Sequence, residues 1–285
     1  MIPSTLASVV YGLIAAVTWG AGDFSGGIAT RRAPVNMVLL LSQVIGIALF
    51  MALALVSNEP LPAMVDVAWS AAAGVCGMVG LVSLYRAMSI GQMGAVAPVS
   101  GVVSAALPAI AYALTHGLPT PVVLLGFILA LAGVWFVSKS GSANTVVAGR
   151  ATSLFLALLS GVGFGSFLIM IAQAQHGSVY WPLAVARAAS LLAVLGWSVY
   201  KRAIHLPPRN AIVPIIAAGV MDGGGNLFFL LSAHAGRLDI AGVLSSLYPA
   251  TTVILALTLL RERLIRSQAV GIALALIAIP LISLP

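Results

Sequence analysis

Uninterrupted apolar runs, each about twenty residues long, occupy most of the 285-residue chain. A helix needs about 20 mostly apolar residues to cross the hydrocarbon core of a bilayer. Breaking the chain at charged residues, proline and asparagine therefore predicts ten transmembrane helices, joined by links too short to hold a soluble domain. Their predicted bounds are 6–28, 37–56, 67–88, 93–115, 121–138, 152–173, 181–200, 212–233, 240–260 and 267–284.

The composition indicates whether this chain is surrounded by water or by lipid. Only 7% of its residues are charged and 61% are hydrophobic, whereas soluble domains carry about 25% charged residues. The formal net charge of +7 does not indicate a nucleic-acid partner, because the basic residues form small clusters between the apolar runs. We therefore predict an all-α integral membrane protein that has the lipid bilayer, and no nucleic acid, as its partner.

The basic residues also predict an orientation. Eleven of them fall on one side of the predicted spans and only Arg237 falls on the other, while Arg187 lies inside the seventh span. Cytoplasmic loops carry the excess of Lys and Arg. We expect a multi-pass protein of a bacterial-type inner (plasma) membrane, with both termini outside. The eleven residues are Arg31, Arg32, Arg86, Lys139, Arg150, Lys201, Arg202, Arg209, Arg261, Arg263 and Arg266.

The two halves of the chain resemble each other at a constant shift of 145 residues. Gly20 matches Gly165 and Gly80 matches Gly225, and several further glycines and serines follow the same shift. We therefore predict two repeats, residues 1–145 and 146–285. Each repeat contains five spans, an odd number, so the repeats must cross the membrane in opposite directions. Inverted repeats with a site at mid-membrane are the recurring plan of secondary transporters.

Short motifs across the whole chain resemble one family. They include Trp19-Gly20, Ala97-Pro98, Gly126, Ser246-Leu-Tyr-Pro249, Leu260-Arg-Glu-Arg-Leu264 and Gly271. With ten spans in a five-plus-five repeat, the chain resembles the EamA-type transporters of the drug/metabolite transporter superfamily. The resemblance implies export or exchange of metabolites, such as amino acids, or of drug-like solutes, driven by a proton or counter-substrate gradient. The first half departs from the pattern, with His116-Gly-Leu118 where the second has Glu262-Arg-Leu264.

Ionisable residues at mid-membrane are costly and mark functional positions. Asp222 lies near the middle of the eighth span, one turn from Asn226, and is the first candidate for coupling transport to protons or cations. Arg187 lies within the seventh span, where it could bind an anionic group of the substrate or pair permanently with Asp222. Asp23 is the second coupling candidate, although its place near Arg31 and Arg32 favours an ion pair at the helix end.

Polar and aromatic residues on several spans complete the predicted substrate site. Small hydroxyls often serve only to join helices, so each residue has a structural alternative to binding. The predicted substrate-binding residues are Trp19, Tyr85, Ser100, Gln173, Arg187, Asn226, Ser245 and Tyr248.

Several kinds of chemistry are not expected. Cys76 is the only cysteine and the four histidines are scattered, so we predict no metal site and no cofactor. No clustered nucleophile and base is visible, and we expect neither catalytic residues nor an enzyme. The hypothesis is a secondary active transporter of small organic solutes working by alternating access; an intramembrane enzyme, receptor or channel is the alternative. The sequence leaves open the substrate, direction, coupling ion and oligomeric state.

Overall fold

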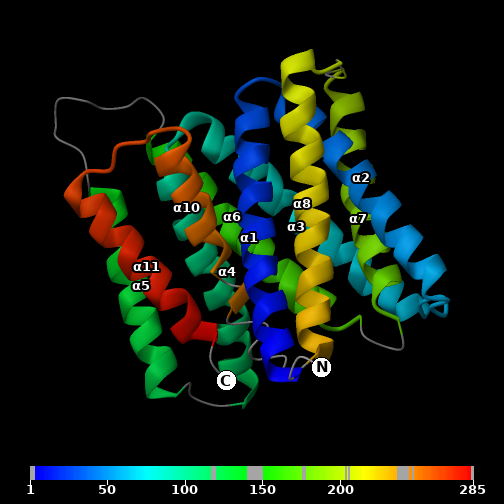
Figure 1. Cartoon of the computed structure of the whole chain (residues 1–285), viewed down its shortest axis with the longest axis horizontal. Helices are drawn as coiled ribbons and strands as arrows, with labels where there is room; N and C mark the ends of the chain where they lie inside the picture. The colour runs from blue at the N-terminus through cyan, green and yellow to red at the C-terminus, as the bar shows by residue number, and fades with distance from the viewer. Residues whose placement is uncertain are drawn as a thin grey trace.

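The chain folds into a bundle of long helices (Figure 1). The computed structural model describes residues 4–116, 120–139, 150–174, 178–202, 204, 206–235, 244, 245 and 247–283, and these residues form helices and connecting turns without a strand. The helices in this part of the chain are α1 (Ser4–Thr30), α2 (Val35–Val56), α3 (Met64–Ile90), α4 (Met93–His116), α5 (Pro121–Lys139), α6 (Arg150–Ile171), α7 (Tyr180–Tyr200), α8 (Arg209–Ala235), α10 (Tyr248–Thr258) and α11 (Arg266–Ser283).

Length and composition make this a membrane protein. Among the described helices, six are long and apolar enough to cross a bilayer, namely α1, α2, α3, α6, α7 and α8. The other four contain shorter apolar stretches. Nine of the ten predicted spans agree with a helix to within three residues at each end. The all-helical membrane fold predicted from the apolar runs is therefore confirmed.

The ninth predicted span differs from its prediction. Leu244 and Ser245 are helical, Leu247 lies in a turn and α10 begins at Tyr248, whereas residues 236–243 and 246 lie outside the described part. Pro249 occupies the first turn of α10. A proline lacks the N–H that would continue a preceding helix, but it fits the first turn, whose N–H groups are unpaired.

The two repeats interlock, because the most extensive helix contacts join one repeat to the other. Helix α1 packs on α8 and α3 packs on α6, which are corresponding pairs under the 145-residue shift. Helix α2 packs on α7 at one flank of the bundle and α5 packs on α11 at the other (Figure 1). The interior of the molecule is therefore the interface between the repeats.

Side-chain contacts establish the opposite directions of the repeats. Thr30 at the end of α1 donates a hydrogen bond of 3.3 Å to the carbonyl of Tyr85 in the last part of α3. Ser153 at the start of α6 donates one of 3.1 Å to the carbonyl of Ala87. The end of α1 and the beginning of α6 thus share one end of the bundle. The clustered basic residues of the links lie at this end, which we call the basic end.

The bundle is closed at the basic end. Its main buried cluster is built from the first turns of α2, α4 and α8 together with the last turns of α3 and α10. Leu39, Met88, Met93, Ile215 and Ala256 are members, and each is at most 1% exposed. Tight packing of this kind leaves no room for a solute to pass without helix movement.

Candidate functional site

An ion pair inside the membrane-spanning part of the bundle is the centre of the candidate site. Arg187 of α7 donates from Nη1 to Asp222 Oδ2 of α8. The two side chains are 14% and 26% exposed, so both are largely removed from solvent. Removing two charges from water is costly, and their attraction offsets that cost only when the geometry is good. The structure thus favours the pairing of Arg187 with Asp222 among the alternatives that the sequence left open.

Helix α2 holds the guanidinium in place. Gln43, which is 1% exposed, accepts a hydrogen bond of 3.2 Å from Arg187 Nη1 through its Oε1. The ring centroid of Phe50 lies 5.9 Å from Arg187 Cζ, within the range of a cation–π contact. Gly46 leaves room for the arginine stem, because a Cβ there would lie 3.4 Å from Arg187 Cδ. Three helices therefore position one charged group.

Asp23 of α1 lies beside this ion pair. Its neighbour Gly22 packs on the backbone of Asp222, where an added Cβ would come within 3.1 Å of the Asp222 nitrogen. This close approach of α1 to α8 places the segments that carry the two carboxyl groups side by side. Asp23 is half-buried, and no ion pair or hydrogen bond is seen for its side chain in the described residues.

The ion pair predicted for Asp23 at the helix end is wrong. Arg31 pairs instead with Glu262, and Arg32 donates a hydrogen bond of 2.8 Å to the carbonyl of Asn210. Asp23 precedes the end of α1 by seven residues, about 10 Å along the helix axis. The two arginines therefore reach neighbouring segments of the chain.

Aromatic side chains pack against one another one turn along α1 from Asp23. The ring of Trp19 lies 5.7 Å from that of Phe229 and 6.4 Å, edge-on, from that of Tyr248. Tyr85 is 2% exposed and packs against Gly26 of α1, three residues after Asp23. Trp19, Tyr85 and Tyr248 are thus brought towards the same region as the three ionisable residues.

Other predicted substrate residues are used differently. Ser100 of α4 shares a hydrogen bond of 2.9 Å with Ser160 of α6, which joins two helices. Ser245 is 3% exposed and also has a partner. Asn226 bonds back to the carbonyl of Asp222 at 2.8 Å, within its own helix. Gln173 lies exposed in the turn after α6, away from Arg187 and Asp222.

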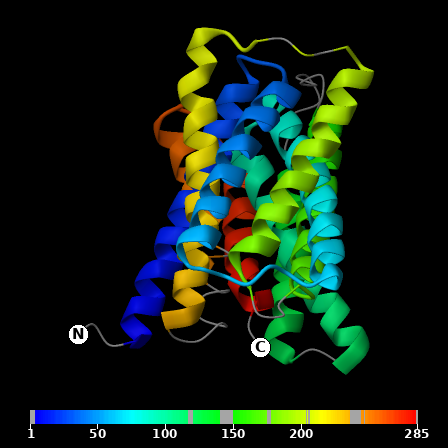
Figure 2. The ribbon, with the colours of Figure 1, turned by 90° about the vertical axis from the view of Figure 1, so that its right-hand side faces the viewer.

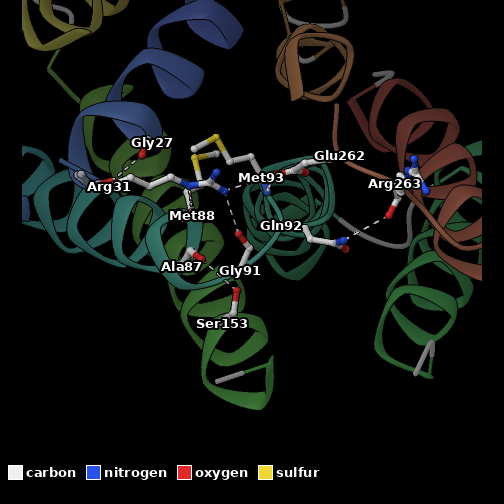
Figure 3. A network of polar contacts seen from close by, with 12 residues as sticks. Gly27, Arg31, Ala87, Met88, Gly91, Gln92, Met93, Ser153, Glu262 and Arg263 are labelled. Carbon is white, nitrogen blue, oxygen red and sulfur yellow. Dashed lines mark hydrogen bonds and ion pairs between the residues drawn. The ribbon is translucent and has the colours of Figure 1, made fainter. Parts of the chain in front are cut away.

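A carboxylate that sequence reasoning treated only as part of a motif organises the basic end (Figure 3). Glu262, in the link after α10, accepts hydrogen bonds of 3.1 Å from the backbone N–H groups of both Met93 and Gly94. It also pairs with Arg31 at 3.4 Å. Negative charge at a helix N-terminus is stabilising. Glu262 therefore caps α4 from the other repeat and ties α1, α4 and α10 together.

Glu59 makes the matching contact at the opposite end. In the link after α2, it accepts hydrogen bonds of 3.0 Å from the N–H of Val179 and 2.8 Å from the N–H of Tyr180, at the start of α7. Each glutamate follows a helix of one repeat and caps the corresponding helix of the other repeat. No local pattern could predict this, because a cap supplied by another segment depends on the tertiary fold.

The charges of the site do not balance. Arg187 carries one positive charge, whereas Asp23 and Asp222 together carry two negative charges when ionised, so the site as a whole is one charge negative. A proton or a cationic group can supply the missing positive charge. Among the described residues, no group of three or more His, Cys, Asp or Glu side chains could hold a metal ion.

These features define a polytopic membrane protein built from two inverted five-helix repeats around buried charges. The model of the EamA-like transporter family matches residues 6–139 and again residues 151–284, bounds that are 145 residues apart. The chain belongs to the EamA-like transporter family, within the drug/metabolite transporter superfamily. The resemblance found in its motifs is therefore confirmed.

Two further similarities support this architecture. An uncharacterized protein of Methanocaldococcus jannaschii is 31% identical over 135 residues, which are 47% of this chain and 97% of that protein. That relative is thus about as long as one repeat. A solved crystal structure superposes with a TM-score of 0.67 over 96% of this chain and 95% of its own, at 16% identity, and this likeness shows the fold.

Proposed function

We propose that the chain is a secondary active transporter that moves a small organic solute by alternating access and couples its movement to protons through Asp23 and Asp222. The observation that carries the proposal is the half-buried group of two carboxylates and one guanidinium where α1 of one repeat packs on α8 of the other. Ionisable residues in this position commonly mark substrate and proton pathways. Asp222 is held by Arg187, which makes Asp23 the carboxyl group best able to take up and release a proton.

The unbalanced negative charge favours a particular class of solute. An ammonium group could replace the proton beside Asp23, so that substrate and proton compete for the same carboxylate. Trp19 and Tyr248 present aromatic rings nearby, and such rings attract cations as well as apolar groups. We therefore propose small amines or amino acids with an apolar body as substrates, moved by export or exchange.

The conformation with the basic end closed is one state of the proposed transport cycle. We place this end in the cytoplasm of a bacterial-type plasma membrane, since it holds the excess of Arg and Lys. In that orientation the described conformation is closed on the cytoplasmic side. Transport then requires α4 and α10 to separate there, which breaks the contacts of Glu262 with Met93 and Gly94.

Proteoliposomes loaded with a pH-sensitive dye test the proposal. Pools of amines, amino acids and small aromatics are added outside, and the wild type is compared with Asp23→Asn and Asp222→Asn. We expect a solute-dependent pH change that either substitution abolishes. The proposal fails if no pool moves protons or labelled solute in the wild type, or if Asp23→Asn keeps the full proton flux.

Asp66→Asn is the matched control. Asp66 is a buried aspartate in the first turn of α3, at the end opposite the basic end, and is 1% exposed. It should keep proton-coupled flux once normalised to the amount of inserted protein. If Asp66→Asn lost as much coupling as Asp23→Asn, the central carboxylates would have no specific role in proton coupling.

A further inference from the structure

An apolar groove opens on the outer surface of the bundle, on the side of α2 that faces α8. Its volume is about 450 Å³, and α2, α8 and the link before α8 form its walls. Leu41, Val44, Leu206, Ile212 and Ile216 line it, and each is at least 40% exposed. Small-ligand pockets span roughly 300–1,000 Å³, so the groove is large enough for a specific occupant.

The groove lies within the leaflet at the basic end. Leu41 and Val44 follow the start of α2 at Val35 by six and nine residues, and Ile212 and Ile216 follow the start of α8 at Arg209 by three and seven. At 1.5 Å per residue these positions lie about 4–14 Å below the helix ends. One leaflet of the hydrocarbon core is about 15 Å thick. The groove therefore faces lipid chains.

Basic residues gather at the end of the bundle that the groove adjoins. Arg32 follows α1, Lys201 and Arg202 follow α7, and Arg209 begins α8, and all four are exposed. The end of α7 and the start of α8 lie at the same end of the bundle as the start of α2 (Figure 2). The described part of the chain pairs two carboxylates with arginines, Glu262 with Arg31 and Asp222 with Arg187, and neither pair involves this cluster.

Two kinds of contact position members of the cluster at this end of the bundle. Arg32 Nη1 donates a hydrogen bond of 2.8 Å to the carbonyl of Asn210, which joins the end of α1 to the start of α8. Lys201 Nζ lies 5.1 Å from the ring centroid of Trp197 and 5.5 Å from that of Tyr200. Trp and Tyr are enriched at the level of the lipid headgroups. The cluster is thus positioned where the phosphate of a phospholipid would lie.

We propose that this groove and the basic cluster at its end of the bundle form a binding site for one anionic phospholipid. An acyl chain lies between α2 and α8, and the phosphate contacts Arg209 and its basic neighbours. Guanidinium groups bind phosphate through paired hydrogen bonds. Basic pockets between membrane helices on the cytoplasmic side are suited to acidic headgroups. The site is separate from the transported solute and does not depend on the proposed function.

Native mass spectrometry of the purified, delipidated protein tests the site. The protein is titrated with phosphatidylglycerol and with phosphatidylcholine of the same acyl chains. We expect the first phosphatidylglycerol to bind at least tenfold more tightly than the first phosphatidylcholine. Arg202→Gln/Arg209→Gln should reduce that preference at least tenfold. Equal binding of the two lipids by the wild type would overturn the proposal.

Two further variants separate a specific site from general electrostatic attraction. Arg263→Gln/Arg266→Gln removes the same charge at the same end of the bundle but away from the groove, and should keep the preference. Val44→Trp fills the groove and retains all basic residues. It should weaken the binding of the first phosphatidylglycerol at least tenfold. Equal losses in the two arginine double variants, or full binding by Val44→Trp, would overturn the proposal.

Discussion

Replacement of Glu262 by glutamine should loosen the basic end of the bundle without unfolding it. The substitution preserves the shape of the side chain and one acceptor oxygen for the N–H groups of Met93 and Gly94. It removes the negative charge at the N-terminus of α4, an interaction worth up to about 2 kcal/mol where the group is partly buried. Glu262 is only 10% exposed in its side chain, so this upper part of the range applies.

The ion pair with Arg31 adds little to the free energy that is lost with the charge of Glu262. The Arg31 side chain is 35% exposed and the N···O distance is 3.4 Å, so solvent screening limits its contribution to less than about 1 kcal/mol. A total of about 2 kcal/mol changes the ratio of open to closed molecules about 30-fold. An open state with a population of about 1% would then rise to roughly a fifth.

Thiol accessibility measures that change. In a Cys76→Ala background, a cysteine replaces Ala256, which is fully buried in α10 and faces Gly94 of α4, with 3.7 Å between its Cβ and a Cβ added at Gly94. The rate of reaction with a maleimide should rise about 30-fold in Glu262→Gln. Glu59→Gln, which weakens the corresponding cap at the other end, should leave this rate unchanged. An unchanged rate in Glu262→Gln, with normal gel-filtration behaviour, would refute the assigned role of Glu262.

Two further predictions concern stability, measured by denaturant unfolding in mixed micelles. Arg187→Gln should lower the free energy of unfolding by about 3–5 kcal/mol, because it leaves the buried carboxylate of Asp222 unpaired. The double variant Arg187→Gln/Asp222→Asn should recover at least half of that loss. Strictly additive effects of the two substitutions would show that the two residues do not interact. Gly74→Ala should cost about 1–3 kcal/mol, because its methyl carbon would lie 2.8 Å from the carbonyl carbon of Ala186. Gly196→Ala, with nothing within 4 Å, should not destabilise the protein; equal losses in the two alanine variants would contradict the packing argument.

Much of this fold could be predicted from the sequence because the bilayer imposes a length on each apolar run. Nine spans were located to within three residues, and the shift of 145 residues returned in the two matches to the family model. In the ninth span the structure shows a turn at Leu247, which the apolar run does not indicate. Pro249, which the sequence analysis used only as part of a motif, lies in the first turn of α10.

The candidate site could be predicted less completely. Asp222 and Arg187 stand out because ionisable residues are rare at mid-membrane, and their pairing was one of the alternatives considered. The partner of Arg31 could not be found in the same way, since Glu262 lies 231 positions away in the sequence. A polar residue type alone does not predict a place in the substrate site. Ser100 joins α4 to α6, and Gln173 is exposed beyond the end of α6.

The central claim is that Asp23 carries the proton that drives net transport, and one comparison in proteoliposomes tests it most directly. Accumulation of a labelled amine or amino acid under a proton gradient is measured beside its exchange at equal pH, in the wild type and in Asp23→Asn. We expect Asp23→Asn to lose accumulation but retain exchange, because a neutral amide cannot take up a proton while the two repeats can still alternate. Accumulation equal to that of the wild type in Asp23→Asn would contradict the central claim.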